Sequence, residues 1–300
     1  MSNQTARLLR SWMFVPGHRQ KMIEKSFGLT KLDAVMLDIE DGVAPAEKQS
    51  AREQIAIALD KAAASDARTP ARYVRINAVG HERMIDDVAA VVRPGLEGLV
   101  LPKVNSPEDI ETVEEYLDRM EPEKGMERNS TRLLVAIESP RGLFRAQEIA
   151  AASPRVIGLI FGAEDFGREL GLPLQREGEA RDLLYARSAF VCGAAAANVQ
   201  AIDGVWPDLN DMDGCVKFAQ QARLIGFSGM SLIHPSQIDA VNAAFTPTAA
   251  ELDYCRKVIQ AFDEAQARGD GAVAFGGQLL DLPIIERARR MLALAESLGS

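Results

Sequence analysis

The sequence Leu133-Leu134-Val135-Ala136-Ile137-Glu138 is an apolar run that ends at a carboxylate. A second run, Val156-Ile157-Gly158-Leu159-Ile160-Phe161, is followed closely by Asp165. Short apolar runs of this kind are typical of strands that are buried on both faces of a parallel sheet. If the two strands are neighbours, Glu138 and Asp165 lie close together, and two carboxylates with open positions suit a hard divalent cation such as Mg²⁺. The alternative for each carboxylate is structural: a helix cap, or an ion pair with Arg141 or Arg168.

Similar apolar runs recur along the chain, with longer amphipathic segments between them. This alternation predicts parallel strands joined by right-handed helical crossovers. Eight such units within about 240 residues fit an α/β fold of the (β/α)8 TIM-barrel type better than a doubly wound sheet, which more typically has five or six strands. The runs are residues 12–15, 34–39, 72–76, 99–101, 133–137, 156–161, 201–205 and 229–233, and the clearest helices are 47–63, 107–120, 179–198 and 211–225.

A tail follows the eighth unit. We predict a catalytic barrel domain over residues 1–245 and a C-terminal helical extension over residues 246–300. The extension contains an expected helix at 249–268, a Gly-rich crossing at 269–281 and a last helix at 283–298. Because no strand remains for the barrel, we expect the extension to pack on a neighbouring subunit or on the outside of the barrel.

The composition excludes several classes of protein. With 47% hydrophobic and 26% charged residues, the chain has a globular composition, and its net charge of -9 argues against a nucleic-acid or anionic-membrane surface. Cys192, Cys215 and Cys255 are scattered, so neither a disulfide framework nor a cysteine metal site is indicated. No apolar run reaches the roughly 20 residues of a membrane span and no signal-type segment is present, so we expect a cytoplasmic protein. The motifs of serine hydrolases, P-loop proteins and zincins do not occur.

Further polar residues follow the other predicted strands, where barrel enzymes carry their reacting groups. Arg75 interrupts an apolar strand, and its forked guanidinium suits a carboxylate or a developing enolate oxygen. The alternative for Arg75 is an ion pair with Asp38 or Glu40. Lys103 has two interpretations, a Schiff-base lysine or a salt bridge, and the salt bridge is favoured. His234 is either a base or a residue that positions the backbone.

These strand-end residues resemble those of the citrate lyase β-subunit family, within the HpcH/HpaI aldolase/citrate lyase superfamily, which includes malyl-CoA and citramalyl-CoA lyases. The resemblance covers nearly the whole chain. Related pyruvate aldolases place a His after the second strand, and the absence of His from residues 40–45 favours thioester chemistry. Family members commonly have Ala at the position of Gly42, a small departure. The matching segments are residues 14–17, 37–43, 74–77, 101–103, 137–142, 161–166, 204–207, 233–235 and 276–283.

The resemblance implies specific roles for residues of this chain. It implies that Glu138 and Asp165 bind Mg²⁺, and that Arg75 contacts the substrate. It also implies that Asp281 is a catalytic residue delivered to the active site of the neighbouring subunit in a homotrimer; the alternative for Asp281 is an N-cap of the last helix. The resemblance further suggests that Phe14, Arg19 and Lys25 help to hold a coenzyme A thioester. We also expect substrate or coenzyme A contacts from Arg75, Glu138, His234 and Pro235.

The predicted function is a Mg²⁺-dependent carbon–carbon lyase. Its expected substrate is a β-hydroxyacyl-CoA, such as a malyl, citramalyl or citryl thioester, which is cleaved to or formed from acetyl-CoA and a 2-oxo acid. One alternative is a class II 2-oxo-acid aldolase that acts without coenzyme A. A second is a non-catalytic subunit that binds a carrier protein, and intact Arg75, Glu138, Asp165 and Asp281 argue against it.

Overall fold

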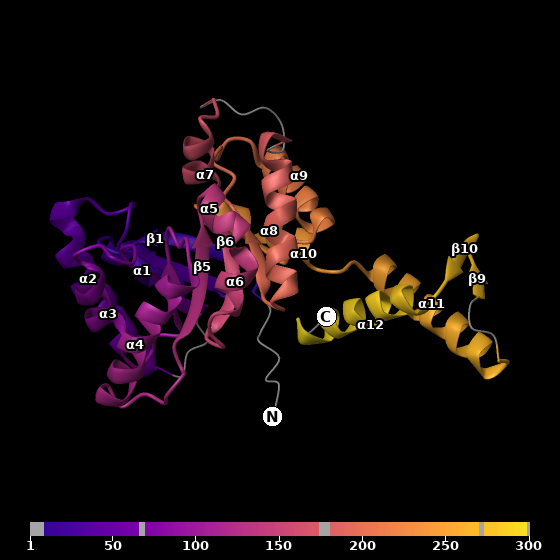
Figure 1. Ribbon diagram of the computed structural model, residues 1–300, viewed down its shortest axis with the longest axis horizontal. Coiled ribbons are helices and arrows are strands. Elements are labelled where there is room, and N and C mark those ends of the chain that lie inside the picture. Colours follow the sequence, from indigo (N-terminus) through magenta and orange to yellow (C-terminus); the bar gives the residue numbers. More distant parts are fainter. Residues whose placement is uncertain (1–8, 66–69, 174–180, 270–272, 299–300) are drawn as a thin grey trace. The chain divides into compact units, whose positions relative to one another are not determined.

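The computed structural model describes residues 9–65, 70–173, 181–269 and 273–298. Eight parallel strands follow one another around a closed barrel, in which β8 pairs with β1. The predicted (β/α)8 TIM barrel is therefore confirmed, and Figure 1 shows helices packed around the strands. The strands are β1 Ser11–Pro16, β2 Ala34–Asp38, β3 Ala71–Arg75, β4 Gly98–Leu101, β5 Arg132–Ile137, β6 Val156–Phe161, β7 Gln200–Asp203 and β8 Gly229–Leu232.

Capping residues mark the beginning or end of several barrel helices. At the start of α4, the Asp109 carboxylate accepts the backbone N–H of Ser106 (3.0 Å) in a capping box. Gly171 (φ 68°) and Gly226 (φ 108°) end α7 and α9 in the left-handed conformation that glycine tolerates best. The helices are α1 Gln20–Phe27, α2 Lys48–Ala63, α3 Met84–Val91, α4 Pro107–Glu123, α5 Pro140–Phe144, α6 Ala146–Ala151, α7 Ala163–Leu170, α8 Leu184–Ala196, α9 Met212–Ile225 and α10 Ile238–Phe245.

Alternate residues of the strands fill the inside of the barrel. Trp12 is fully buried and packs edge-on against Tyr73, with ring centroids 4.9 Å apart. The same alternation places Arg75 two residues beyond Tyr73 and Glu138 two residues beyond Ala136. Both charged side chains therefore rise from the inside of the barrel at the C-terminal ends of their strands.

A buried ion pair fixes the loop that leads into β5. The Glu121 carboxylate, at the end of α4, pairs with Arg155 (2.7 Å) and accepts the backbone N–H groups of Asn129 (2.7 Å) and Thr131 (2.8 Å). Burial alone would raise the pKa of Glu121, but Arg155 and the two N–H groups outweigh it and lower the pKa to about 2. This carboxylate thus stabilises the approach to the strand that ends at Glu138.

We expect the isosteric variant Glu121→Gln to lower the free energy of unfolding by about 3 kcal/mol at neutral pH, since the pKa is depressed in the folded state. This contribution is fully present above the unfolded pKa of about 4.3 and decreases as the pH falls toward 2, to about half by pH 3. Urea unfolding at pH 7 and pH 3 measures it. Glu123→Gln, an exposed neighbour, is the control. If wild type and Glu121→Gln differed in unfolding free energy by the same amount at pH 7 and pH 3, the lowered pKa of Glu121 would be contradicted.

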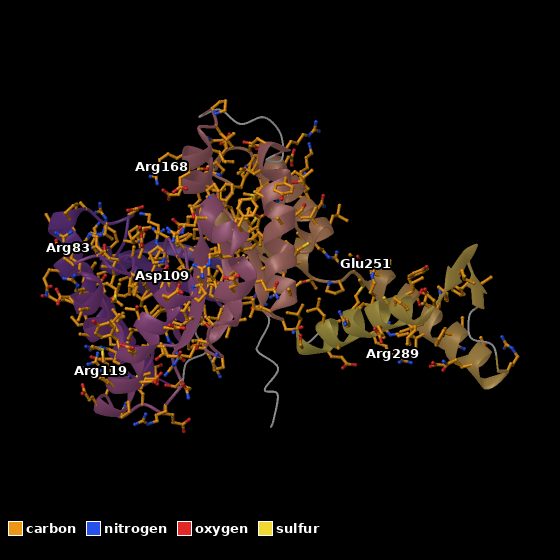
Figure 2. The ribbon with its side chains drawn as sticks, in the orientation of Figure 1. Arg83, Asp109, Arg119, Arg168, Glu251 and Arg289 are labelled. Carbon is orange, nitrogen blue, oxygen red and sulfur yellow. The ribbon has the colours of Figure 1, made fainter. Side chains whose placement is uncertain are left out.

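The C-terminal unit has its own apolar core. The chain divides into a barrel unit, Leu9–Asn242, and a second unit whose described part starts at Ala243. This second unit contains α11 Ala249–Ala267, β9 Val273–Phe275, β10 Gln278–Leu280 and α12 Leu282–Ser297. Arg289 of α12 pairs with Asp263 of α11 (3.4 Å; Arg289 is labelled in Figure 2). The buried residues of the core are Cys255, Val258, Phe262, Leu280, Ile285 and Ala288.

The Gly-rich crossing is a β-hairpin in its described part, which the sequence analysis did not predict. β9 and β10 pair antiparallel, with Gly276 (φ 58°) and Gly277 (φ 83°) between them. Two successive residues with positive φ are characteristic of a type I′ turn, and Gly-Gly is among the pairs that favour it. The strands have only three residues each, too few to give a clear alternation in the sequence. None of the described helices is long and apolar enough to span a membrane.

Candidate functional site

Glu138 and Asp165 lie at the ends of neighbouring strands, as predicted. β5 and β6 pair in register up to Ile137 and Phe161, and the N–H of Gly162 then donates to the Ile137 carbonyl (3.0 Å). Glu138 directly follows β5, whereas Asp165 stands in the first turn of α7. The Glu138 side chain packs on Gly162, where an added Cβ would lie 2.4 Å from Glu138 Cγ. A glycine is therefore required for this close approach.

The Glu138 carboxylate is buried and forms no ion pair with another residue that the structure describes. Its residue is 7% exposed. Burial raises the pKa of Glu138 to about 8, and the negative charges of Glu40 and Asp165 act in the same direction against Arg75. Asp165 pairs with Arg168 (2.6 Å), one of the structural alternatives considered for it, but Arg168 is mostly exposed. Glu138 does not cap the following helix, because Ser139 does so by accepting the N–H of Gly142 (2.9 Å).

This pair of carboxylates fits a divalent cation. Burial is the main cause of the raised pKa of Glu138 and the nearby Asp165 carboxylate adds to it, so a cation held by the two carboxylates would take the place of a proton. Within the described part of the chain, no group of three or more His, Cys, Asp or Glu side chains is arranged for a metal. A site with two protein carboxylates leaves positions for water and substrate oxygens, which is the usual arrangement for Mg²⁺.

Arg75 is held in place by two carboxylates. Its Nε and Nη2 donate to the two oxygens of Asp38, both at 2.7 Å, and its Nη1 lies 3.1 Å from Glu40 Oε2. Burial alone would lower the pKa of Arg75, but Asp38 and Glu40 outweigh it and raise the pKa. The guanidinium also lies over the ring of Phe14, 4.8 Å from its centroid. The ion pairs considered as the alternative are thus present, and they orient Arg75.

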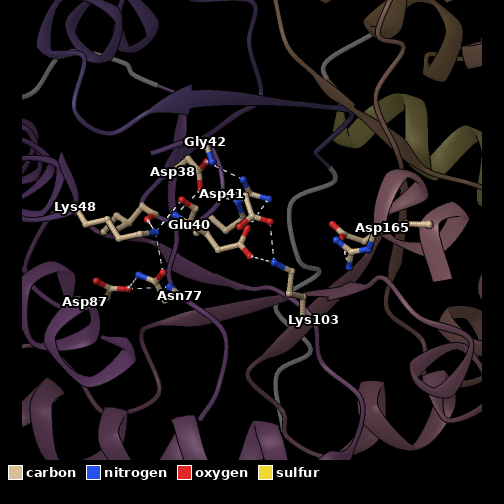
Figure 3. Close-up of polar contacts among 12 residues, drawn as sticks. Asp38, Glu40, Asp41, Gly42, Lys48, Asn77, Asp87, Lys103 and Asp165 are labelled. Atoms are coloured by element: carbon tan, nitrogen blue, oxygen red, sulfur yellow. Dashed lines mark hydrogen bonds and ion pairs between the residues drawn. The ribbon is translucent and has the colours of Figure 1, made fainter. Parts of the chain in front are cut away.

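Lys103 forms a salt bridge, the favoured interpretation of this residue. Its Nζ lies 2.5 Å from Glu40 and 2.7 Å from Asp41, as Figure 3 shows. Burial alone would lower the pKa of Lys103, but these two acids outweigh it and raise the pKa, so the amine stays protonated and unsuited to a Schiff base. Lys103 has a φ of 56°, an unusual value outside glycine. Such strained residues cluster at functional sites.

A buried polar chain supports the loop after β2. The Lys48 ammonium donates to the carbonyls of Ile39 (2.7 Å) and Glu40 (3.0 Å) and to the Asn77 side chain (2.9 Å). Asn77 in turn donates to Asp87 (Figure 3). Burial lowers the pKa of Lys48. The sequence analysis missed Lys48 and Asp87, because charged residues of amphipathic helices α2 and α3 give no sign of their burial.

One cavity at the C-terminal ends of the strands is lined by Phe14, Arg75, Glu138 and Asp165 among others. Its volume is about 150 Å³, comparable to a cavity that accepts a six-carbon ring. A larger hollow of about 240 Å³ lies between α1 and α2 on the outside of the barrel and contains none of the predicted site residues. The lining of the first cavity consists of Phe14, Arg75, Val100, Ala136, Glu138, Ile160, Phe161, Gly162, Ala163, Glu164, Asp165, Gly204, Val205 and Ser231.

The structure brings only some of the predicted contacts together. Phe14 lines the cavity, but Arg19 and Lys25 are exposed at the beginning and in the last turn of α1. His234 caps the turn after β8 by accepting the N–H of Ser236 (3.1 Å), and neither His234 nor Pro235 lines the cavity. This geometry supports the backbone-positioning role of His234.

Asp281 belongs to the C-terminal unit and stands at the N-cap of α12, the structural alternative that was considered for it. Its side chain is exposed and accepts no capping hydrogen bond from the described residues. The carboxylate is therefore not committed to holding the helix.

The fold and the cavity define a TIM-barrel enzyme with a carboxylate pair suited to a divalent cation. Residues 10–235 match the model of the HpcH/HpaI aldolase/citrate lyase family. The chain belongs to this family, and it is a carbon–carbon lyase.

Relatives and solved structures cover almost the whole chain. The citrate lyase subunit beta of Escherichia coli (strain K12) is 40% identical, over 100% of this chain and 97% of its own. The mitochondrial citramalyl-CoA lyase of Rattus norvegicus is 33% identical, over 99% of this chain and 89% of its own. The protein CitE from Mycobacterium tuberculosis, solved in complex with magnesium, acetoacetate and coenzyme A, has a TM-score of 0.77 and 31% identity, over 97% of this chain and 99% of that chain.

Proposed function

We propose that this lyase is magnesium-dependent and cleaves a β-hydroxyacyl-CoA into acetyl-CoA and a 2-oxo acid. The observation that carries the proposal is the buried Glu138 carboxylate beside Asp165, in the same cavity as the Arg75 guanidinium. The two carboxylates proposed to hold the cation and the guanidinium of Arg75 thus line the same small cavity. The magnesium in the M. tuberculosis structure and the named activities of the relatives support the same chemistry.

The chain's own residues have separate tasks in this cleavage. Glu138 and Asp165 would hold the cation; when bound, Mg²⁺ supplies a Lewis acid that lowers the pKa of the substrate hydroxyl. Once the hydroxyl has released its proton to solvent water, the carbon–carbon bond breaks, the hydroxyl oxygen becomes the carbonyl oxygen of the 2-oxo acid, and the electron pair of the broken bond moves onto the acetyl thioester as an enolate. Arg75 stabilises the negative charge that develops on the enolate oxygen. A proton then reaches the acetyl carbon from Asp281, which we propose belongs to a neighbouring subunit.

Coenzyme A extends beyond the cavity in this proposal, because about 150 Å³ holds only the acyl part. Arg19 and Lys25 are exposed on α1, which follows β1 at the rim, and six residues of helix separate them by about 9 Å. Both are basic and make no ion pair with a described residue, so they are suited to coenzyme A phosphates. Phe14, on the strand that precedes α1, lines the cavity.

We expect Arg75→Lys to keep the fold and to reduce kcat by on the order of 10²-fold or more, since a point charge cannot reproduce the forked contact. Steady-state kinetics with the best substrate measure the effect. The control is Arg72→Lys, on the same strand but outside the cavity, where Arg72 pairs with Glu97. Turnover of Arg75→Lys at the parental rate would show that Arg75 is only a structural partner of Asp38.

The synthetic direction distinguishes this proposal from an aldolase without coenzyme A. The purified protein is incubated with acetyl-CoA and glyoxylate, pyruvate or oxaloacetate, and separately with pyruvate and an aldehyde, with and without Mg²⁺. We expect magnesium-dependent formation of a β-hydroxyacyl-CoA and no aldol product. Aldol product without coenzyme A would support the class II aldolase, and no product in any mixture would favour a non-catalytic subunit.

Assembly and location remain part of the proposal. We propose a homotrimer in the cytoplasm in which the barrel spans residues 1–245 and the extension, residues 246–300, packs on a neighbouring subunit. The second unit has an apolar core of its own and an exposed Asp281, which supports such an exchange.

A further inference from the structure

The closed end of the cavity differs chemically from its rim. The rim carries Arg75, Glu138 and Asp165, whereas the most deeply buried lining side chains include Val100, Ile160 and Ser231. Ser231, on β8, is 1% exposed. Of the described residues that line the cavity, it carries the only uncharged polar side chain. The cavity thus ends in an apolar wall with a single hydroxyl.

The Ser231 hydroxyl has no hydrogen-bond partner among the described residues. Ser231 pairs in register with Trp12 of β1. The indole N–H of Trp12 is not available to it, because it already donates to the carbonyl of Leu9 (3.0 Å). A buried hydroxyl that loses its hydrogen bonds to water and gains none in the protein is unfavourable. Such groups in folded proteins generally have a structural or functional explanation. Here the hydroxyl borders the space that the substrate would fill.

The proposed cleavage leaves one part of the substrate for this end of the cavity. The carbon that bears the hydroxyl has four substituents. Its hydroxyl and carboxylate belong near Glu138 and Asp165, and its acetyl thioester belongs near Arg75 and the mouth of the cavity. The fourth substituent is then directed toward Ser231. It is hydrogen in a malyl thioester, methyl in a citramalyl thioester and carboxymethyl in a citryl thioester.

We propose that Ser231 Oγ donates a hydrogen bond to an oxygen of this fourth substituent and so makes the enzyme selective for dicarboxylic 2-oxo acids. The inference rests on the proposed function, because it concerns the acyl part of the same substrate. A carboxymethyl group supplies a charged acceptor, whereas a methyl group leaves the hydroxyl unpaired. The methylene of the carboxymethyl group packs against Val100, Ala136 and Ile160.

The test compares wild type, Ser231→Ala and Ser231→Thr with citryl-CoA and citramalyl-CoA in the presence of Mg²⁺. We expect wild type to prefer the citryl thioester in kcat/KM. Ser231→Ala should lose this preference by roughly tenfold or more, with less than a twofold change for the citramalyl thioester. Ser231→Thr, which keeps a hydroxyl, should retain more of the preference. Ser228→Ala is the matched control, because its hydroxyl donates to Ala201 O (3.1 Å) and lies outside the cavity.

A binding measurement separates this inference from the proposed function. Calorimetric titration of each variant with oxaloacetate and with pyruvate, with Mg²⁺ present, requires no turnover. We expect Ser231→Ala to weaken oxaloacetate binding by roughly tenfold relative to pyruvate. If wild type cleaves no thioester but shows this shift, the proposed function fails and the role of Ser231 stands. A wild-type preference for pyruvate, an equal effect on both acids or no binding of either would overturn the role of Ser231.

Discussion

Glu138→Gln folds normally and loses magnesium-dependent turnover by on the order of 10³-fold, because Lewis-acid stabilisation of the transition state is worth several kcal/mol. The amide has the shape of the carboxylate but removes the buried negative charge that a cation would neutralise. Asp165→Ala is expected to have the same effect. In both variants the loss should be in kcat and in metal affinity together, since each residue is proposed to hold the cation.

Titration calorimetry with Mg²⁺ and steady-state kinetics measure these two effects. Glu169→Gln is the control, because it removes an exposed carboxylate from the same helix as Asp165 without touching the cavity. It should bind Mg²⁺ and turn over as wild type does. Full activity of Glu138→Gln, or of wild type in excess chelator, would refute the metal site.

Asp281→Asn assembles normally and is almost inactive, with a loss on the order of 10²-fold to 10⁴-fold that is typical of a missing general acid–base. The substitution is informative because Asn caps a helix as well as Asp does, so α12 keeps its N-cap. A loss of activity then reports on proton transfer and not on folding. Circular dichroism and sedimentation check the fold and the assembly.

Complementation shows whether the site is shared between subunits. The Arg75→Ala and Asp281→Asn proteins are incubated separately, and then together, under conditions that allow subunit exchange. Only the mixture of the two should regain activity, because some pairs then combine an intact Arg75 from one chain with an intact Asp281 from its neighbour. Activity of Asp281→Asn at the wild-type rate, or no recovery after confirmed exchange, would count against the shared site.

The sequence predicted the barrel and its rim well, since both follow from local patterns. Buried parallel strands are continuous apolar runs, and the polar residue after each run marks the end where barrel enzymes place their chemistry. Glu138 and Asp165 were found in this way, and the structure places them just beyond the ends of the neighbouring strands β5 and β6. Arg75 was found because a charge interrupts an apolar strand.

Features that depend on distant partners were not predictable. Lys48 and Asp87 belong to ordinary amphipathic helices. Only the fold shows that both hydrogen-bond to Asn77 and that Lys48 also donates to the Glu40 carbonyl. Ser231 is one small polar residue in a strand, and its proposed role depends on its burial and on the lack of a hydrogen-bond partner among the described residues. The hairpin around Gly276 was missed because its strands are too short for a periodic pattern.

Cleavage of defined thioesters, with every product quantified, tests the central claim most directly. The purified protein and Mg²⁺ are incubated with malyl-CoA, citramalyl-CoA and citryl-CoA, and acetyl-CoA, free CoA and the 2-oxo acid are measured over time. The account predicts equal amounts of acetyl-CoA and 2-oxo acid from at least one thioester, no free CoA, and no reaction in excess chelator. Release of free CoA with the acyl chain intact, or no conversion of any of the three thioesters, would contradict it.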